Sequence, residues 1–365
     1  MVIKKQALKK MRILVTGNTG YIGPVLAKYL KKNANKNFEI IGYDQGYFAH
    51  CLTDCSYLPE FNYDKQHWGD LREFPFELLN NIDCVIHLAA ISNDPMGNTF
   101  EKITEEINYQ ASIKIAQEAK ARGVSSFVFA SSCSIYGIAE DSSRKENNQL
   151  NPLTAYAKSK VAMEKDLSKL ASESFVVTAL RFATACGMSS RLRLDLVLND
   201  FVACALTSKN ITVLSDGSPW RPLIDVIDMS RAISWAIDRK FEIGGSFLPI
   251  NTGSKNWNYQ IKDLANIVSK FIPGTKVSIN TNAKSDERSY RVDFSLFEKL
   301  APMHQPVMSI EETIQEIIQG LKNMQFSDSH FRSSKYMRLK VLQDHIESKR
   351  LNLNLKWTKV NNNSF

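Results

Sequence analysis

Three side chains have the types and spacing of a proton-transfer site. Tyr156 and Lys160 stand four residues apart in TAYAKSK, so on a helix they share one face. The reference pKa of a phenol is about 10, and a neighbouring ammonium group favours the phenolate. Ser132 ends an apolar run 24 residues before Tyr156, where its hydroxyl could stabilise charge on the same substrate oxygen. Together they could take a proton from a substrate hydroxyl as hydride leaves the same carbon. The alternative is a Tyr/Lys pair that stands on a helix surface by chance.

Residues 12–23, RILVTGNTGYIG, are typical of a dinucleotide site that could accept the hydride. A short apolar strand leads through three glycines into an amphipathic helix over 21–32. Helix N-terminal amides at such a turn favour a pyrophosphate. Gly17 permits the turn, Gly20 lets the backbone approach the phosphate, and Gly23 lets the helix pack close to the strand.

Asp44 indicates NAD rather than NADP. It ends the next apolar run, FEIIGYD, 21 residues after Gly23. A carboxylate there suits a ribose 2′-hydroxyl and repels a 2′-phosphate. The alternative is a plain turn residue at a strand end. Asp70, at the end of a short edge strand predicted over 67–72, is expected to meet the adenine amino group.

The elements that must position these groups alternate between strand and helix. After the glycine segment, strands are predicted over 82–90, 125–137 and 175–187, and helices over 99–122 and 154–173. This alternation indicates an α/β fold, a Rossmann-type doubly wound parallel sheet covered on both faces. Ligands in such folds lie at the carboxyl ends of the strands. The glycine loop, Asp44, Asp70, Ala89–Ala90 and Ser131–Ser134 all fall at those ends.

The alternation fades from about residue 188, which predicts a smaller, interleaved C-terminal substrate-binding region. Helices are expected over 191–209, 226–239, 258–271, 308–324 and 336–349, and short strands over 211–217 and 221–226. The predicted organisation is a basic lead, a dinucleotide-binding domain, a mixed α/β substrate-binding region and a basic helical tail, over 1–10, 11–187, 188–329 and 330–365.

Composition excludes several other classes. The 365 residues are 44% hydrophobic and 23% charged, as in an ordinary soluble protein. The net charge of +8 comes from the two ends, 1–12 and 330–365, which are expected to be solvated tails or partner surfaces. A basic nucleic-acid groove is therefore not expected. Six cysteines without framework spacing indicate reduced thiols in a cytoplasmic protein. No apolar run has membrane-spanning length, and the scattered histidines argue against a metal site.

The motifs together resemble the extended short-chain dehydrogenases/reductases, and within them the NAD-dependent nucleotide-sugar epimerases and dehydratases of the UDP-glucose 4-epimerase type. The resemblance spans about residues 11–253 and is carried by TGNTGYIG, Asp44, GDL (69–71), HLAA (87–90), ASSCSIYG (130–137), YAKSK (156–160) and RPLIDVID (221–228). It implies a seven-stranded sheet, bound NAD, a Ser/Tyr/Lys site, and a homodimer formed through helices 99–122 and 154–173. Asn108 matches a helix asparagine that supports the fold near the site.

The expected cofactor contacts combine the strand-end residues with those of the resemblance. They are Gly17, Asn18, Gly20, Tyr21, Ile22, Gly23, Asp44, Asp70, Leu71, Leu88, Ala89, Ala90, Asn108, Tyr156 and Lys160.

Departures from the family pattern narrow the expected chemistry. Sugar 4,6-dehydratases carry an Asp-Glu pair where this chain has Cys133 and Ser134, which disfavours elimination of water. Enzymes of the GDP-fucose-synthase type use a Cys at the position of Ser134 and a His acid, and no histidine stands between residues 88 and 303. What remains is redox at one carbinol, most often C4. A 4-epimerase returns the hydride to the other face of the ketone, and a 4-ketoreductase or dehydrogenase exchanges its cofactor. A non-catalytic dinucleotide-binding scaffold or redox sensor is the alternative of another class, and it would not need Ser132, Tyr156 and Lys160.

The substrate is expected to be a nucleotide-diphosphate sugar. Guanidinium groups bind phosphate in a bidentate way, and Arg221 is the best placed by motif. For Arg191 and Arg288, a phosphate contact and an ordinary surface position are about equally expected. Asn93 follows the AA turn and could touch the sugar, although N-D-P is equally a plain turn. Ala183 stands where the family often has Asn. The candidate substrate contacts are Asn93, Cys133, Ser134, Thr184, Arg191, Asn199, Arg221, Arg288 and Arg291.

Overall fold

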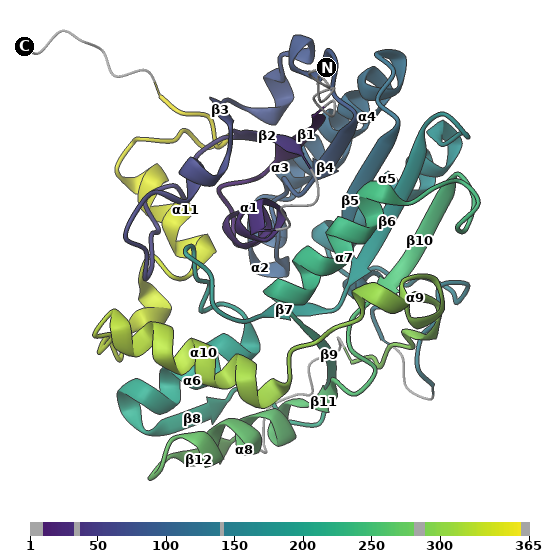
Figure 1. Cartoon of the computed structure of the whole chain (residues 1–365). Helices are drawn as coiled ribbons and strands as arrows, with labels where there is room; N and C mark the ends of the chain where they lie inside the picture. Colours follow the sequence, from purple (N-terminus) through teal and green to yellow (C-terminus); the bar gives the residue numbers. More distant parts are fainter. Residues whose placement is uncertain (1–9, 33–36, 139–141, 281–288, 359–365) are drawn as a thin grey trace, which may run out of the picture.

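A seven-stranded parallel sheet forms the centre of the computed structural model, which describes residues 10–32, 37–138, 142–280 and 289–358 (Figure 1). All neighbouring strands are parallel. Their order across the sheet is β10 (Phe247–Thr252), β6 (Val176–Phe182), β5 (Ser126–Ser132), β4 (Cys84–His87), β1 (Met11–Thr16), β2 (Phe38–Asp44) and β3 (Lys65–Trp68). The expected Rossmann-type sheet is confirmed.

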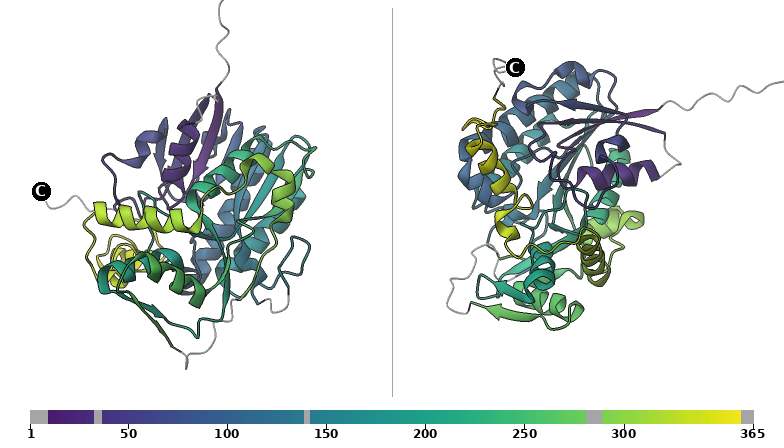
Figure 2. Two further views of the ribbon diagram at one scale, coloured as in Figure 1. Left: turned by 60° about the horizontal axis from the view of Figure 1, so that its bottom comes forward. Right: turned by 90° about the vertical axis from the view of Figure 1, so that its left-hand side faces the viewer.

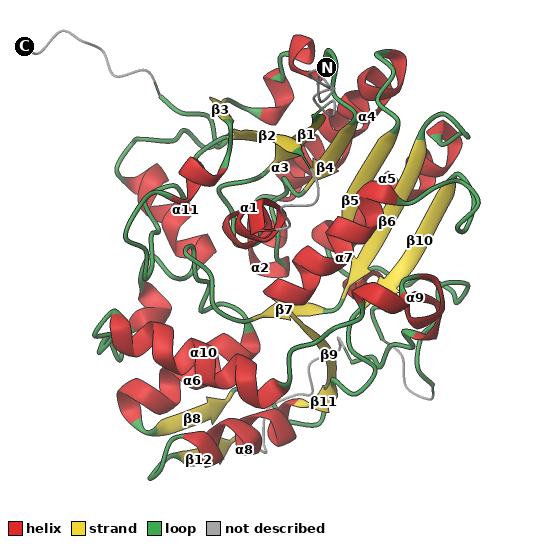
Figure 3. Ribbon diagram, viewed as in Figure 1, coloured by secondary structure: helices red, strands yellow, loops and turns green. Residues whose placement is uncertain are grey.

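Helices cover both faces of the sheet, as Figure 3 shows. Successive side chains of a strand point to opposite faces, so Ile13 and Val15 belong to one core and Leu14 to the other. The first core is closed by α1 (Gly23–Lys32), α7 (Val226–Asp238) and α9 (Ser295–Leu300). The second is closed by α3 (Glu101–Glu105), α4 (Ser112–Ala121) and α5 (Ala155–Leu170), with α2 (Asp94–Thr99) at their end.

The predicted helix over 99–122 is interrupted. A π-helical turn, Glu106–Ala111, separates α3 from α4. The Ser112 hydroxyl donates to the Ile107 carbonyl, five residues earlier, at 2.7 Å. Such a bulge re-aims side chains locally. Here it places Asn108, whose amide binds both the N–H and the C=O of Ile91 (2.8 and 3.0 Å).

A second, smaller region lies beyond the carboxyl ends of the central strands (Figure 2) and has a hydrophobic core of its own. It contains a three-stranded sheet and a two-stranded sheet, formed by β7 (Thr184–Cys186), β9 (Trp220–Asp225) and β11 (Asn258–Gln260), and by β8 (Asn210–Val213) and β12 (Lys276–Ile279). Its helices are α6 (Val197–Ser208), α8 (Ile261–Phe271) and α10 (Ile310–Asn323). The chain returns from this region to the central sheet with α7 and β10 and then enters the region again. The two regions are therefore interleaved in the sequence.

The strand expected over 125–137 ends at Ser132, where a 3₁₀ turn begins. Two further predicted strands also differ from the structure. The single strand expected over 175–187 divides at Ala183 into β6 of the central sheet and β7 of the second region. The strand expected over 67–72 is β3, Lys65–Trp68, and Asp70 instead caps a 3₁₀ turn by accepting from the Arg72 N–H at 2.8 Å. A short polar side chain at that position competes with strand pairing by bonding the backbone.

The described part of the C-terminal segment, residues 330–358, packs on the body of the protein, where the charge pattern predicts a solvated tail or a partner surface. Helix α11 (Arg338–Glu347) buries Leu342 in the second core of the sheet, and Leu351 and Leu355 follow it there. This basic segment therefore lies on the body of the protein.

Within the described ranges, no helix combines the length and the apolar character that crossing a bilayer requires. In the same part of the chain, no three His, Cys, Asp or Glu side chains gather as metal ligands would.

Candidate active site

One cleft of about 850 Å³ joins the strand ends of the central sheet to the second region. The glycine loop, the ends of β2, β4 and β5, and the first turns of α5 form one side of it. Residues of α6, β8 and β9 form the other side. The expected site residues that line the cleft are Gly17, Gly20, Tyr21, Ile22, Asp44, Asp70, Leu71, Leu88, Ala89, Ala90, Asn93, Ser132, Ser134, Tyr156, Lys160, Thr184 and Arg221.

Ser132, Tyr156 and Lys160 meet at this cleft. The Lys160 Nζ atom donates to the Ala130 carbonyl at 2.7 Å and lies 5.4 Å from the centroid of the Tyr156 ring. Ser132 caps the 3₁₀ turn that follows β5, and its Oγ atom accepts from the Ser134 N–H at 3.1 Å. The Ser132 side chain also forms a hydrogen bond with that of Tyr156, so the two hydroxyl groups lie next to each other at the cleft.

Burial is the main cause of the pKa shifts of Tyr156 and Lys160. It raises the pKa of Tyr156 to about 12, and the Asp94 carboxylate raises it further, whereas the hydrogen bond with Ser132 and the charge of Arg193 lower it. Burial lowers the pKa of Lys160 to about 7, against the charge of Glu164. The Arg193 guanidinium is thus a further positive charge that favours the phenolate. A positive charge near the ring would lower the Tyr156 pKa further.

The glycine turn has the geometry that its sequence predicts. Gly17 has φ +74°, and a Cβ atom there would lie 2.5 Å from the Ala89 Cα atom. A Cβ atom on Gly23 would lie 1.9 Å from the Asn18 carbonyl oxygen, so only glycine lets α1 pack this closely. Tyr21 and Ile22, directly before α1, line the cleft.

The two acidic strand-end residues are held by the protein itself. The Asp44 carboxylate accepts from the Thr19 and Gly46 N–H groups at 3.0 and 2.7 Å. The Asp70 carboxylate accepts hydrogen bonds from Nε and Nη2 of Arg72 at 3.0 and 2.6 Å. Both side chains still line the cleft.

Two candidates for phosphate binding are used elsewhere. Arg191 is 1% exposed and donates to the carbonyls of Phe48 and Ala49 and to the Glu60 carboxylate. The side chain of Asn199 bonds the backbone of Gly187 and Arg193. Neither lines the cleft. Both instead brace the segment 187–193, because a buried polar side chain must find a partner where it lies.

Other candidates also lie outside the cleft lining. Cys133 is fully buried, its thiol bonds the Arg181 carbonyl, and burial raises its pKa. The Asn18 amide donates to Gln66 at 2.7 Å. Arg291 lies over the Trp220 ring, 5.3 Å from its centroid. Gly23 lets α1 pack against the Asn18 backbone, and Asn108 supports the backbone of Ile91; neither lines the cleft. Arg288 lies outside the described residues.

Several lining residues were not predicted. Arg193 forms a fork with Asp195, with two N–O distances of 2.9 Å, and its Nη1 atom donates to Ser92. Asp195 also accepts from the Asn93 side chain at 2.7 Å. The alternating charges in RLRLD were their only local signal. Arg332, Met337 and Arg338 reach the cleft from the C-terminal segment, and no local pattern indicates that.

Comparison with known proteins agrees with this geometry. The model of the NAD dependent epimerase/dehydratase family matches residues 13–247. The chain belongs to this family. An "uncharacterized UDP-glucose epimerase YtcB" of Bacillus subtilis is 31% identical over 247 residues, which are 64% of this chain and 75% of that protein. A UDP-N-acetyl-alpha-D-glucosaminuronate decarboxylase of Bacillus cytotoxicus is 25% identical over 87% of this chain and 99% of its own.

Several solved structures share the fold of this chain. A UDP-N-acetylglucosamine 4-epimerase from Methanobrevibacter ruminantium, in complex with UDP-N-acetylmuramic acid, aligns with a TM-score of 0.73 and 21% identity, over 87% of this chain and 100% of that one. MoeE5, in complex with UDP-glucose and NAD, aligns with a TM-score of 0.71 and 21% identity, over 86% and 99%.

NAD is the cofactor of this family member. The residues present fit it. The Gln45 Oε1 atom lacks a hydrogen-bond partner among the described residues, although Gln45 lines the cleft directly after Asp44. The turn on Gly17 and the first residues of α1 would hold the pyrophosphate, and Asp44 would bind the ribose. When bound, NAD supplies an acceptor and donor of hydride.

Proposed function

We propose that this epimerase/dehydratase family member is an NAD-dependent nucleotide-sugar 4-epimerase that acts through a transient 4-keto intermediate. One observation carries the proposal: Ser132, Tyr156 and Lys160 meet at a single cleft, and no acidic residue stands at positions 133 and 134. Cys133 is buried away from the cleft, and Ser134 lines it with a hydroxyl that no described residue binds. This arrangement favours redox at one carbinol over elimination.

The side chains have separate roles in this mechanism. Tyr156 accepts the proton of the sugar 4-hydroxyl and later returns it to the 4-keto oxygen. Ser132 donates a hydrogen bond to the same oxygen in both half-reactions. Lys160, held by the Ala130 carbonyl, places its ammonium group near the phenol ring. Arg193 adds positive charge that favours the phenolate.

The substrate proposed is a nucleoside diphosphate sugar that lies across the cleft. Arg221 lines the cleft from β9, at the side opposite the glycine turn, where it could bind a phosphate. Thr184 and Asn93 line it nearer the strand ends. Arg291 lies over Trp220 of β9 and is proposed to support this strand rather than to contact the substrate.

The test is isotope tracing with UDP-glucose, UDP-galactose and their N-acetyl and uronic acid analogues in deuterated water, followed by NMR. A 4-epimerase interconverts a C4 pair without incorporating deuterium at C4, since the hydride returns to the carbon that it left. Deuterium at C3 or C5, or loss of water, would replace this proposal with another reaction. Turnover that requires added NADH would indicate a 4-ketoreductase, and NAD binding without turnover of any sugar would favour a scaffold.

We also propose that the protein is a cytoplasmic homodimer. Helices α4 and α5 lie side by side on one face of the sheet, and the family resemblance places the dimer contact on this pair. The described cysteines are all free, in accord with a reducing compartment. Light scattering that gives the mass of one chain would contradict the dimer.

A further inference from the structure

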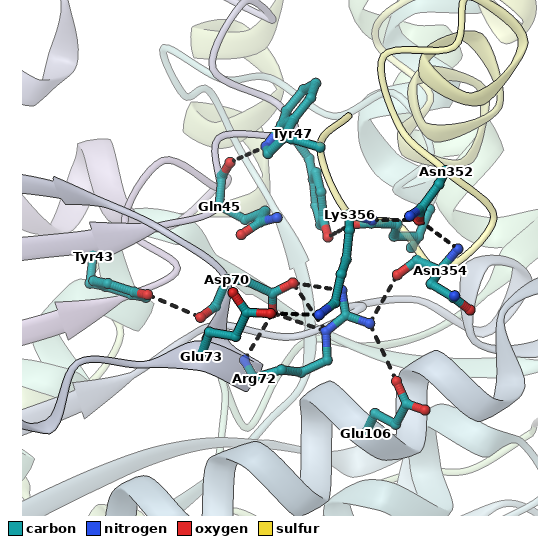
Figure 4. A network of polar contacts seen from close by, with 12 residues as sticks. Tyr43, Gln45, Tyr47, Asp70, Arg72, Glu73, Glu106, Asn352, Asn354 and Lys356 are labelled. Carbon is teal, nitrogen blue, oxygen red and sulfur yellow. Dashed lines mark hydrogen bonds and ion pairs between the residues drawn. The ribbon is translucent and has the colours of Figure 1, made fainter. Parts of the chain in front are cut away.

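Residues 350–358, here called the C-terminal clasp, lie against two loops of the cleft (Figure 4). One loop follows β2 and begins with Asp44, and the other follows β3 and contains Asp70. These are the loops that would receive the ribose and adenine of NAD. In the sequence, the clasp lies about 310 residues after the first loop and about 280 residues after the second.

The clasp bonds the loop after β2 at two points. The Trp357 Nε1 atom donates to the Gln45 carbonyl at 2.8 Å, and the Tyr47 hydroxyl donates to the Leu355 carbonyl. Gln45 and Tyr47 both line the cleft, whereas Trp357 does not. The clasp therefore holds the segment directly after Asp44 from behind.

The loop after β3 is held through Arg72. Two nitrogen atoms of its guanidinium bind the Asp70 carboxylate, and the third, Nη1, donates to the Asn354 carbonyl at 2.9 Å. Lys356 pairs with Glu73 of the same loop at 2.6 Å. A guanidinium fork has fixed geometry, so the position of Asn354 helps to orient Asp70.

The clasp contains a turn that its own side chains stabilise. The Asn352 Oδ1 atom accepts from the N–H groups of Asn354 and Lys356 at 2.9 and 3.0 Å. Leu351 and Leu355 are 2% and 0% exposed, in the core that also holds Tyr47. The clasp can therefore impose its conformation on both loops.

We propose that the C-terminal clasp is part of the dinucleotide site: it preorganises the loops that bind the adenosine half of NAD and slows release of the cofactor. Loops that are ordered before binding pay no ordering cost on binding, which strengthens affinity, mostly through a slower dissociation rate. The proposal concerns cofactor retention, and it stands whichever sugar reaction the protein performs.

The test uses the full chain with two substitutions inside the clasp, Asn352→Ala and Trp357→Phe. The first removes the acceptor that shapes the turn, and the second removes the donor to Gln45 while keeping an aromatic ring. Neither residue lines the cleft. We expect the dissociation rate of NAD, measured by displacement with excess ADP-ribose, to rise at least tenfold. Affinity for ADP-ribose, which lacks nicotinamide, should fall by a similar factor, and affinity for UDP should stay within twofold.

The matched control is Asn148→Ala with Trp235→Phe. Asn148 also accepts a backbone N–H, from Lys145 at 2.7 Å, and Trp235 is a buried residue of α7 outside the cleft lining. This control should leave NAD dissociation unchanged even where it lowers the melting temperature. A clasp variant that melts lower but releases NAD within twofold of the wild-type rate would overturn the proposal. So would equal losses of NAD and UDP affinity, because they would indicate a general loss of structure.

A third substitution addresses Asp70 separately. Arg72→Lys keeps the charge but lacks the fork that joins Asp70 to Asn354. We expect weaker ADP-ribose binding in this variant, and no change in Lys169→Met, which removes only an exposed ion pair outside the clasp. Unchanged binding in Arg72→Lys would contradict the route through Asp70.

Discussion

Thr154 and Asp94 join the two elements on either side of the candidate catalytic tyrosine. The Thr154 hydroxyl caps α5 by accepting from the Ala157 N–H at 3.2 Å, and it donates to the Asp94 carboxylate at 2.6 Å. The first turn of α5, which carries Tyr156, is therefore tied to the first turn of α2. The same carboxylate raises the pKa of the phenol.

Replacing Asp94 with Asn should lower the pKa of Tyr156, because the acceptor for Thr154 is kept and the negative charge is removed. Proton acceptance needs the phenolate, so the rising limb of the pH–rate profile should move to lower pH, by roughly one unit. The control is Asp166→Asn, which changes a carboxylate bound to Tyr109 outside the cleft lining. An unmoved profile would separate Asp94 from the titration of Tyr156.

Tyr156→Phe should lower turnover by about 10²- to 10⁴-fold, the usual contribution of a positioned acid or base. Affinity for NAD should hardly change, because the ring is retained. Steady-state kinetics and equilibrium binding measure the two effects. Tyr109→Phe is the matched control, and a Tyr156 variant with the wild-type rate would disprove the mechanism.

Lys160 predicts a pH dependence of folding stability in the cofactor-free protein. Its pKa is about 7 when folded and about 10.4 when unfolded. Between these values the unfolded chain binds more protons, so this group makes stability rise with pH. The free energy of unfolding of the wild type relative to Lys160→Met should increase by up to about 1.4 kcal/mol per pH unit from pH 7 to 9. Urea titrations measure it. Lys169→Met, at an exposed residue, should show no such slope, and a flat difference for Lys160 would refute the shift.

Asp44→Ala should weaken NAD by roughly 10- to 100-fold, the loss of a hydrogen bond to a charged group, and NADP much less. The reason is that the carboxylate suits a 2′-hydroxyl and repels a 2′-phosphate. Calorimetric titration with both cofactors is the measurement, and Asp64→Ala, outside the cleft lining, is the control. Equal losses for the two cofactors would remove the ribose assignment.

Gly23→Ala should cost about 1–3 kcal/mol of stability, as overpacking does, since the new methyl group meets the Asn18 backbone at 1.9 Å. NAD should bind more weakly as the first turn of α1 shifts. Gly123→Ala separates space from backbone conformation, because Gly123 has φ +80° and no atom within 4 Å of its Cβ position. If thermal melting shows the same cost at both positions, the close approach of α1 is not the cause.

The sequence indicated which residues line the cleft where local pattern and shared topology suffice. Gly17, Asp44, Ser132 and Ala89 stand at strand ends, and parallel strands bring their carboxyl ends to one edge. Tyr156 and Lys160 share a face through helical spacing alone. It failed where side-chain direction matters: Arg191 and Asn199 turn to backbone carbonyls and N–H groups that no sequence pattern announces.

The sequence by itself determined the strand–glycine–helix turn, the parallel α/β sheet and the serine, tyrosine and lysine of the cleft, because apolar periodicity and glycine spacing are encoded within short segments. Only the tertiary structure decided that Arg193 adds positive charge near Tyr156, and that residues 350–358 lie behind Asp44 and Asp70. Both depend on contacts between distant segments, which are selected by burial and by the need of each buried polar group for a partner.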